Sequence, residues 1–258
     1  MQRSKLSELW LTKIKNYLSS VNKWDKNAAV NLYEREVLNK TYSNEEHLQV
    51  LIYAFLTSQC PWERVVPHLG EIDEIFYNYN FDIIKKHDYH EFLDAIKAIK
   101  CGNRQLPAQM RALHENISVL EKIINDFGSI DNFIVSDNPN NTVKKLIDWR
   151  SPYKIKQLGE ALSREYLRGV GIDNVKPDLH LRRFLGNGRM GESKEEIASV
   201  QEVLDQVEKL HEKTGYKRVE IDSIIWKYCS NGNGEICTAL PHCVKCVVRD
   251  QCKYNKKR

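Results

Sequence analysis

The sequence predicts an all-α protein, and two observations carry this prediction. Apolar residues recur at helical spacing in nearly every periodic segment, and convincing strand alternation is absent. Signals that start and stop helices stand beside these segments, such as Ser43 placed three residues before Glu46. We therefore expect helices joined by loops, and no sheet.

Two helices are expected in the first half of the chain. Residues 48–56 place leucine, isoleucine and phenylalanine on one face, after a capping box formed by Ser43 and Glu46. Residues 117–127 form a second apolar face that ends at Gly128. Glycine suits this position because it tolerates the left-handed backbone that follows many helices.

Two more helices are expected in the second half. Residues 197–207 repeat at helical spacing, with Ser193 and Glu196 as the expected capping box at their start. Residues 221–228 form the fourth helix, which runs into a cysteine-rich stretch. Two loops are also expected, at residues 137–141 and 231–234.

The composition is that of an ordinary soluble globular protein. The chain has 258 residues, of which 41% are hydrophobic and 29% charged, and its net charge is +4. This length allows one large domain or two modest ones. No stretch approaches the ~18 apolar residues of a membrane helix, and residues 1–20 alternate charged and apolar residues rather than form a signal segment. The mild positive charge is compatible with a polyanionic partner but does not require one.

Four of the seven cysteines lie close together near the C-terminus, namely Cys237, Cys243, Cys246 and Cys252. Four thiolates suit an iron–sulfur cluster or zinc. Zinc sites usually pair two short knuckles, whereas here one knuckle is flanked by two single cysteines, so the spacing favours a [4Fe–4S] cluster over zinc. Disulfides are disfavoured because a chain of this length buries enough core without them. Metal-bound thiols indicate a reducing, intracellular compartment, such as the cytoplasm and its nucleoid.

A second informative stretch covers residues 155–183. A turn that ends at Gly159 is expected between helices at about 142–149 and 159–167. A glycine here lets backbone N–H groups approach a phosphate, and the N-terminus of the next helix adds its dipole. The alternative is an ordinary corner whose glycine supplies a positive φ.

Asp178 is expected at the start of another helix, because Pro177 disfavours helix before it. Aspartate is a preferred N-cap, and capping alone would explain it. A carboxylate on such a rigid turn can also point outward and stabilise a cationic, oxocarbenium-like sugar.

In combination, these features resemble the endonuclease III and adenine-glycosylase branch of the helix-hairpin-helix DNA glycosylases. The resemblance spans about residues 45–254 and rests on three stretches. The family's cluster signature, P-x-C-x-x-C-x(5)-C-x-Y, is matched from Pro241 to Tyr254. The family's D-x-H-x-x-R is matched by Asp178, His180 and Arg183, and its L-x-x-Q by residues 56–59.

Three departures from the family pattern bear on function. The gap between the first two cluster cysteines is five residues, where endonuclease III has six, and Cys229 is an alternative ligand nearby. The family's L-x-G-x-G reads Ile155-Lys-Gln157-Leu-Gly159 here, which keeps only the last glycine. Bifunctional members carry a nucleophilic lysine two residues after that glycine, where this chain has Ala161. A rival register with the hairpin at residues 169–171 places Asp173 there and lacks the lysine too.

The resemblance implies a two-lobed fold, with a six-helix barrel domain at residues 40–168, hairpin included, and a cluster domain formed by residues 1–39 and 169–258. It implies a monomer that binds double-stranded DNA and no membrane. Such a protein flips out a damaged or mispaired base and hydrolyses its N-glycosidic bond, with Asp178 as the catalytic residue. Without the lysine, AP-lyase activity is not expected. The alternatives are a bifunctional enzyme that uses another amine, a catalytically silent binder of DNA lesions, and a zinc-ribbon regulator.

Further residues receive roles from the same resemblance. The cluster ligands are Cys237, Cys243, Cys246 and Cys252, and the DNA contacts are Gln59, Lys156, Gly159, His180, Lys245 and Arg249. Structural roles are favoured elsewhere: core packing for Trp62 and Trp149, with stacking on a base as the alternative, and buried thiols for Cys60 and Cys101. For Arg183 a structural ion pair is favoured, with a contact to Asp178 or to the hairpin as the alternative. Residues 100–140 form a segment longer than in compact family members, and nothing in it identifies the base that is excised.

Overall fold

The structure is a computed structural model that describes residues 2–24, 29–60 and 62–256, without the side chains of residues 2–9, 62 and 256. Throughout these residues the regular elements are helices, and no strand is found among them. The predicted all-α class is therefore confirmed. No helix in the same ranges is both long enough and apolar enough to cross a bilayer.

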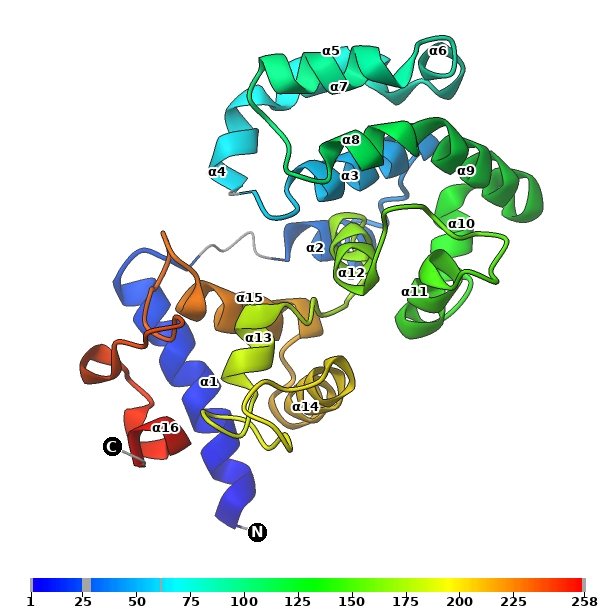
Figure 1. The fold of residues 1–258 in the computed structure, drawn as a ribbon. Coiled ribbons are helices and arrows are strands. Elements are labelled where there is room, and N and C mark those ends of the chain that lie inside the picture. Colours follow the sequence, from blue (N-terminus) through cyan, green and yellow to red (C-terminus); the bar gives the residue numbers. More distant parts are fainter. Residues whose placement is uncertain (1, 25–28, 61, 257–258) are drawn as a thin grey trace. The chain divides into compact units, whose positions relative to one another are not determined.

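The chain divides into two compact units (Figure 1). Unit 1 consists of Met1–Val30 and Asp173–Arg258, and unit 2 consists of Asn31–Ile172. The sequence-based expectation placed the limits at 39/40 and 168/169 instead. Each unit has its own hydrophobic core.

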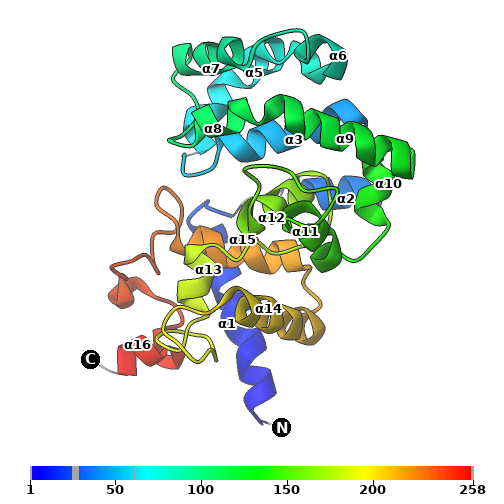
Figure 2. The ribbon, with the colours of Figure 1, turned by 45° about the vertical axis from the view of Figure 1, so that its right-hand side comes forward.

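Unit 2 is built around α3. Its elements in chain order are α2 (Val30–Glu36), which begins at the unit boundary, α3 (Asn44–Leu56), α4 (Trp62–Val65), η1 (Val66–His68), α5 (Leu69–Ile75), η2 (Tyr77–Tyr79), α6 (Phe81–Ile84), α7 (Tyr89–Ala98), α8 (Leu106–Arg111), α9 (Leu113–Phe127), α10 (Ile130–Val135), α11 (Pro139–Ile147) and α12 (Glu160–Gly169). Helices α8, α10 and α12 pack against α3, and Figure 2 shows α8 beside it. Leu51, Ile52 and Phe55 of α3 are buried, and burial of each such side chain contributes about 1.5–3 kcal/mol.

The predicted helix signals of unit 2 are confirmed at two positions. The Ser43 hydroxyl accepts a hydrogen bond from the Glu46 backbone N–H at 3.1 Å, and Glu46 Oε2 accepts one from the Ser43 N–H at 2.8 Å, which completes the capping box of α3. Gly128 ends α9 with a φ of 85°. Local sequence therefore sets these two helix ends.

A buried polar network joins four helices of unit 2. His47 on α3 lies 3.0 Å from an oxygen of Asp131 on α10 and 2.7 Å from the hydroxyl of Tyr166 on α12. Arg35 on α2 donates to both Asp131 oxygens and, at 2.7 Å, to the carbonyl of Val170. Burial opposes ionisation of Asp131, but the hydrogen bonds from His47 and Arg35 lower its pKa to about 2. The network fixes α2 within this unit.

Unit 1 is built around α15. Its elements are α1 (Gln2–Ser20), α13 (Leu179–Phe184), α14 (Val200–Thr214), α15 (Arg218–Cys229), η3 (Cys243–Lys245), η4 (Arg249–Gln251) and α16 (Lys253–Lys256). Helices α1, α13 and α14 all pack against α15. Ile224, Ile225 and Tyr228 of α15 have no exposed surface, so this helix carries the core of the unit and ends at the cysteine-rich stretch.

The predicted start of the third helix is wrong. Helix α14 begins at Val200, after a capping box of Ser199 and Glu202, and not after Ser193 and Glu196. Tertiary contacts hold the preceding residues out of the helix: the N–H of Ala198 donates to the Arg182 carbonyl at 2.8 Å. A strong local signal was overridden by pairing with α13.

The predicted loop at residues 137–141 is wrong in its second half. Asn138 is the N-cap of α11, with its side chain accepting from the Asn141 N–H at 3.0 Å, and Pro139 is the first helical residue. Proline suits this position because the first N–H groups of a helix have no intrahelical partner. The expected loop at 231–234 does lie in a turn.

Candidate functional site

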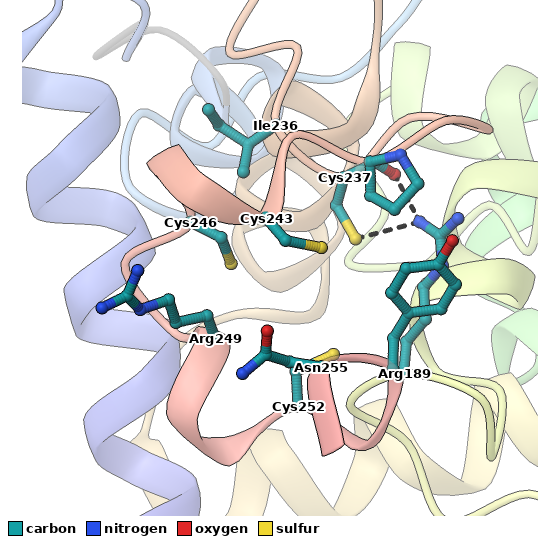
Figure 3. A pocket seen from close by; sticks show the side chains of 10 residues that line it. Arg189, Ile236, Cys237, Cys243, Cys246, Arg249, Cys252 and Asn255 are labelled. Carbon is teal, nitrogen blue, oxygen red and sulfur yellow. Dashed lines mark hydrogen bonds between the residues drawn. The ribbon is translucent and has the colours of Figure 1, made fainter. Parts of the chain in front are cut away.

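The four clustered cysteines line one pocket in unit 1. Figure 3 shows the sulfur atoms of Cys237, Cys243, Cys246 and Cys252 around a common space. The pocket is partly open to solvent. Cys237 and Cys252 are buried, whereas Cys243 and Cys246 are partly exposed.

Short hydrogen-bonded turns bring these cysteines together. The Cys246 N–H donates to the Cys243 carbonyl at 3.2 Å, and the Cys252 N–H to the Arg249 carbonyl at 3.1 Å. The Cys237 N–H donates at 3.2 Å to the carbonyl of Tyr228, on the last turn of α15. Cys237 is thus fixed to the core helix, and the other three cysteines lie in or directly after two 3₁₀ turns.

Arg189 is a residue of this site that sequence reasoning missed. Its side chain is nearly buried, and one nitrogen donates to both the carbonyl and the sulfur of Cys237, at 2.7 and 2.9 Å. The second nitrogen donates to the Thr238 carbonyl at 2.8 Å. Figure 3 shows this guanidinium at the edge of the pocket. The signal that could have indicated it is an arginine inside the glycine-rich stretch at residues 186–191.

The glycines around Arg189 are required by close backbone contacts. A Cβ atom on Gly191 would lie 1.7 Å from the Leu185 carbonyl oxygen, and one on Gly186 would lie 1.9 Å from the Glu196 carbonyl oxygen. Only glycine therefore permits the tight loop that presents Arg189. The backbone carbonyl of Arg189 in turn accepts the Lys253 N–H at 3.0 Å, which attaches α16 to the same loop.

Two further hydrogen bonds reach cysteine sulfurs. Tyr228, which is fully buried, donates its hydroxyl to Cys246 at 3.3 Å. Cys229, the last residue of α15, is also fully buried and shares a hydrogen bond with Cys237. This bond from Cys229, together with the Arg189 guanidinium, lowers the pKa of the Cys237 thiol to about 7. Thiolate is the form that binds metals, so these neighbours favour the ligand state of Cys237.

The donor set fits a cluster held by four thiolates. The sulfurs are arranged around an open space, and hydrogen bonds from nitrogen and hydroxyl donors reach two of them, as expected around cluster-bound thiolates. No three or more His, Cys, Asp or Glu side chains in the described part of the chain are placed to hold a single metal ion. Cys229 does not line the pocket.

Asp178 lies in unit 1 and caps α13. One oxygen of its carboxylate accepts hydrogen bonds from the N–H groups of His180 and Leu181, at 2.8 and 3.1 Å. The residue is partly exposed. The expected helix start is therefore present, and two backbone donors set the orientation of the carboxylate.

The neighbours of Asp178 differ from expectation in one respect. Among the described residues, Arg183 forms no ion pair or hydrogen bond through its side chain, so the structural ion pair expected for it is not found there. The ring of His180 meets Trp226 edge-on, with centroids 6.3 Å apart. Its Nδ1 atom is buried and has no hydrogen-bond partner in the described ranges.

The turn before α12 lies in unit 2, at the expected residues, but Gly159 is not the residue with a positive φ. Gly159 is the N-cap of α12 with a φ of −101°, and a Cβ atom there would touch nothing, so its glycine is not required by conformation. The left-handed residue is Gln157, with a φ of 62°. It stands where the family pattern has its first hairpin glycine.

The turn is fixed to α9 through Asn116. The buried Asn116 side chain accepts the Lys156 N–H at 2.7 Å and donates to the Lys156 carbonyl at 3.1 Å. The ammonium of Lys156 pairs with Glu115 at 2.6 Å and is half exposed. The two expected helices around the turn are α11 and α12, which end and begin at Ile147 and Glu160.

The remaining expected DNA contacts lie on the surfaces of both units. In unit 2, Gln59 is exposed and has a left-handed φ of 57°, a strained conformation for a residue other than glycine. In unit 1, Lys245 is exposed, and Arg249 borders the cysteine pocket and is 52% exposed, near Asp250.

Two of the structural expectations are wrong and one is met. Trp149 is 80% exposed instead of lying in the core. Cys60 is partly exposed rather than buried, whereas Cys101 is buried as expected. The side chain of Trp62 lies outside the described residues.

Searches of this chain against models of protein families, against curated proteins and against solved structures find no match. Function must therefore be argued from the residues themselves.

Proposed function

We propose that this protein is a DNA glycosylase that hydrolyses the N-glycosidic bond of a damaged or mispaired base and has no lyase activity. The observation that carries the proposal is the Asp178 carboxylate. It is partly exposed, and two backbone N–H groups orient it at the start of α13. It follows by nineteen residues the Gly159 turn that resembles a DNA-binding hairpin.

The chemistry assigned to Asp178 is stabilisation of a sugar cation. When the base departs with the electron pair of the N-glycosidic bond, positive charge develops on the deoxyribose ring. A carboxylate beside that ring stabilises the charge, and the same carboxylate can accept a proton from the attacking water. Water then supplies the new C–O bond, and the products are a free base and an abasic site. The base must first leave the helix, because the bond is inaccessible within the duplex.

The absence of lyase activity is supported by the lysines beside the turn. Ala161 occupies the position of the family's nucleophile. The ammonium of Lys154 donates to the Ile147 carbonyl at 2.7 Å, and the ammonium of Lys156 pairs with Glu115. Both amines are engaged by these partners, whereas a Schiff base with the sugar requires a free amine as nucleophile.

A [4Fe–4S] cluster is proposed as a structural cofactor held by Cys237, Cys243, Cys246 and Cys252. When bound, the cluster supplies a covalent staple for the C-terminal loop. Arg189 neutralises part of the negative charge of the thiolates and bonds to Cys237. Iron and sulfide content and a visible absorption band in anaerobically purified protein test this assignment, and zinc without sulfide would refute it.

Contacts with phosphate are proposed for the Gln157–Gly159 turn and for Lys156, Lys245 and Arg249. His180, which is partly exposed, is also proposed as a phosphate contact. Gln59 is proposed to fill the space that a flipped nucleotide leaves, because it is exposed on a strained turn. Binding to duplex DNA should weaken steeply with salt, since each phosphate contact releases counterions.

The deciding experiment compares Asp178→Asn with Asp88→Asn. Asp88 is the N-cap of α7, and its side chain accepts the His90 N–H at 2.9 Å, so both variants exchange a capping carboxylate for another good cap. Base release is measured on duplexes that contain uracil, oxidised pyrimidines, 8-oxoguanine, mismatched adenine or alkylated purines. The proposal predicts release from at least one substrate, loss of about 100-fold or more in Asp178→Asn, and no change in Asp88→Asn.

Two outcomes would overturn parts of this proposal. A covalent adduct with damaged duplex after borohydride reduction would show a Schiff base and so a bifunctional enzyme. DNA binding without base release from any substrate would indicate a catalytically silent lesion binder, in which Asp178→Asn has no base-release activity to reduce.

A further inference from the structure

Trp149 lies at the tip of a closed loop in unit 2, between α11 and the Gln157–Gly159 turn. The loop spans residues 147–154. It is closed at its base by the hydrogen bond from the Ile155 N–H to the Leu146 carbonyl, at 2.9 Å. A turn closed by the Ser151 N–H on the Asp148 carbonyl, also at 2.9 Å, leaves Trp149 and Arg150 at its two central positions.

Trp149 is exposed although its loop is held in place by several hydrogen bonds. Tyr153 donates its hydroxyl to Asp126 of α9 at 2.9 Å, and Lys154 donates to the Ile147 carbonyl at 2.7 Å. Arg150 binds both oxygens of Asp148 through two nitrogens, at 3.2 and 3.0 Å. The loop is therefore anchored at several points and still presents an indole that is 80% exposed. Tryptophan is highly buried on average in folded proteins, so an anchored and exposed one indicates a contact with a ligand.

The charge around Trp149 indicates which kind of ligand. Residues 144–156 hold five cationic side chains and one carboxylate, so this stretch alone carries as much net positive charge as the whole chain. Lys144 is exposed and forms no ion pair within the described residues, and the side chains of Arg150 and Lys156 are 70% and 51% exposed. The guanidinium carbon of Arg150 lies 5.8 Å from the Trp149 ring centroid. A flat aromatic ring beside an arginine, on a stretch rich in cations, is an arrangement that can stack on a nucleic-acid base while the cations meet phosphates.

We propose that Trp149 stacks on an unpaired base of DNA, next to the strand held by the Gln157–Gly159 turn. The proposal rests on the proposed function in taking DNA as the ligand, and it adds a preference for strands whose bases are not already stacked in a duplex. Such strands are single-stranded segments, or duplexes opened at a lesion. Stacking is tolerant of sequence because every base has a π-face, so no base preference is expected.

Affinities of Trp149→Ala, Trp149→Phe and Tyr33→Ala test this proposal. Tyr33 is the matched control, an aromatic of the same unit that is 54% exposed and is followed on α2 by Glu34 and Glu36. The probes are a fluorescein-labelled single strand, the matching duplex, and that duplex with an internal unpaired bubble. Trp149→Ala should weaken binding to the single strand and the bubble about tenfold, which corresponds to about 1.4 kcal/mol for one stacked base. Trp149→Phe should retain most of the affinity, and Tyr33→Ala all of it.

A second readout separates contact from altered folding. DNA should protect part of the tryptophan fluorescence from iodide quenching in the wild type, and Trp149→Phe should remove that protection. Wild-type protein that binds none of the three probes would overturn both this inference and the proposed function. Wild-type protein that binds them, with Trp149→Ala unchanged on the single strand and the bubble, would overturn the stacking role alone.

Discussion

Replacement of Arg189 by methionine should destabilise unit 1 strongly. Methionine has a similar length but no donors, so the change leaves two carbonyl groups and the Cys237 sulfur without their partner. Each hydrogen bond from a charged group contributes about 1.5–3 kcal/mol. The three share one side chain and are not additive, so a total loss of about 3–5 kcal/mol is expected, the range for breaking a buried charge interaction. This is a large part of the 5–15 kcal/mol that typically stabilises a folded protein.

The assay is urea denaturation of the purified protein, with iron content measured on the same samples. Arg189→Lys should be intermediate, because an ammonium keeps the charge but cannot reach three acceptors in a fixed fork. Arg104→Met is the surface control, since Arg104 is exposed and forms no hydrogen bond or ion pair through its side chain in the described ranges. Equal free energies of unfolding for Arg189→Met and wild type would refute the role of Arg189 as the residue that holds the cysteine loop.

Three further changes test the packing arguments. Asp131→Asn should lower the free energy of unfolding by about 2 kcal/mol at neutral pH. Because the pKa of Asp131 is lowered to about 2, the difference from wild type should disappear as the pH falls from about 4 to 2. Urea titrations measure this, and a difference that stays constant with pH would contradict it. Gly191→Ala should destabilise the protein by about 3 kcal/mol. The control Gly70→Ala, where a Cβ meets nothing, should not destabilise it. Thermal melting measures both. Cys229→Ser should keep the iron that Cys237→Ser loses, and loss in both would make Cys229 a ligand.

Local sequence determined much of the fold of this protein. The capping box of Ser43 and Glu46 and the stop at Gly128 depend on hydrogen bonds and backbone angles within a few residues, so they could be predicted. Asp178 could be placed at a helix start for the same reason. The start of α14 could not, because a hydrogen bond to the distant Arg182 holds Ala198 out of the helix.

In the candidate site, too, some features could be predicted from the sequence and others could not. Its four cysteines are close in the chain, so their spacing alone suggested a common centre, and the structure places them around one pocket. Arg189 lies 48 residues from Cys237, and nothing in the sequence between them indicates that one donates to the other. Exposure is likewise a property of the whole fold: tryptophan is usually buried, so a core position was expected for Trp149, and only the structure shows that its ring is exposed. Short-range hydrogen bonding and periodicity are encoded within a few residues, whereas burial and long-range pairing depend on how all the helices pack together.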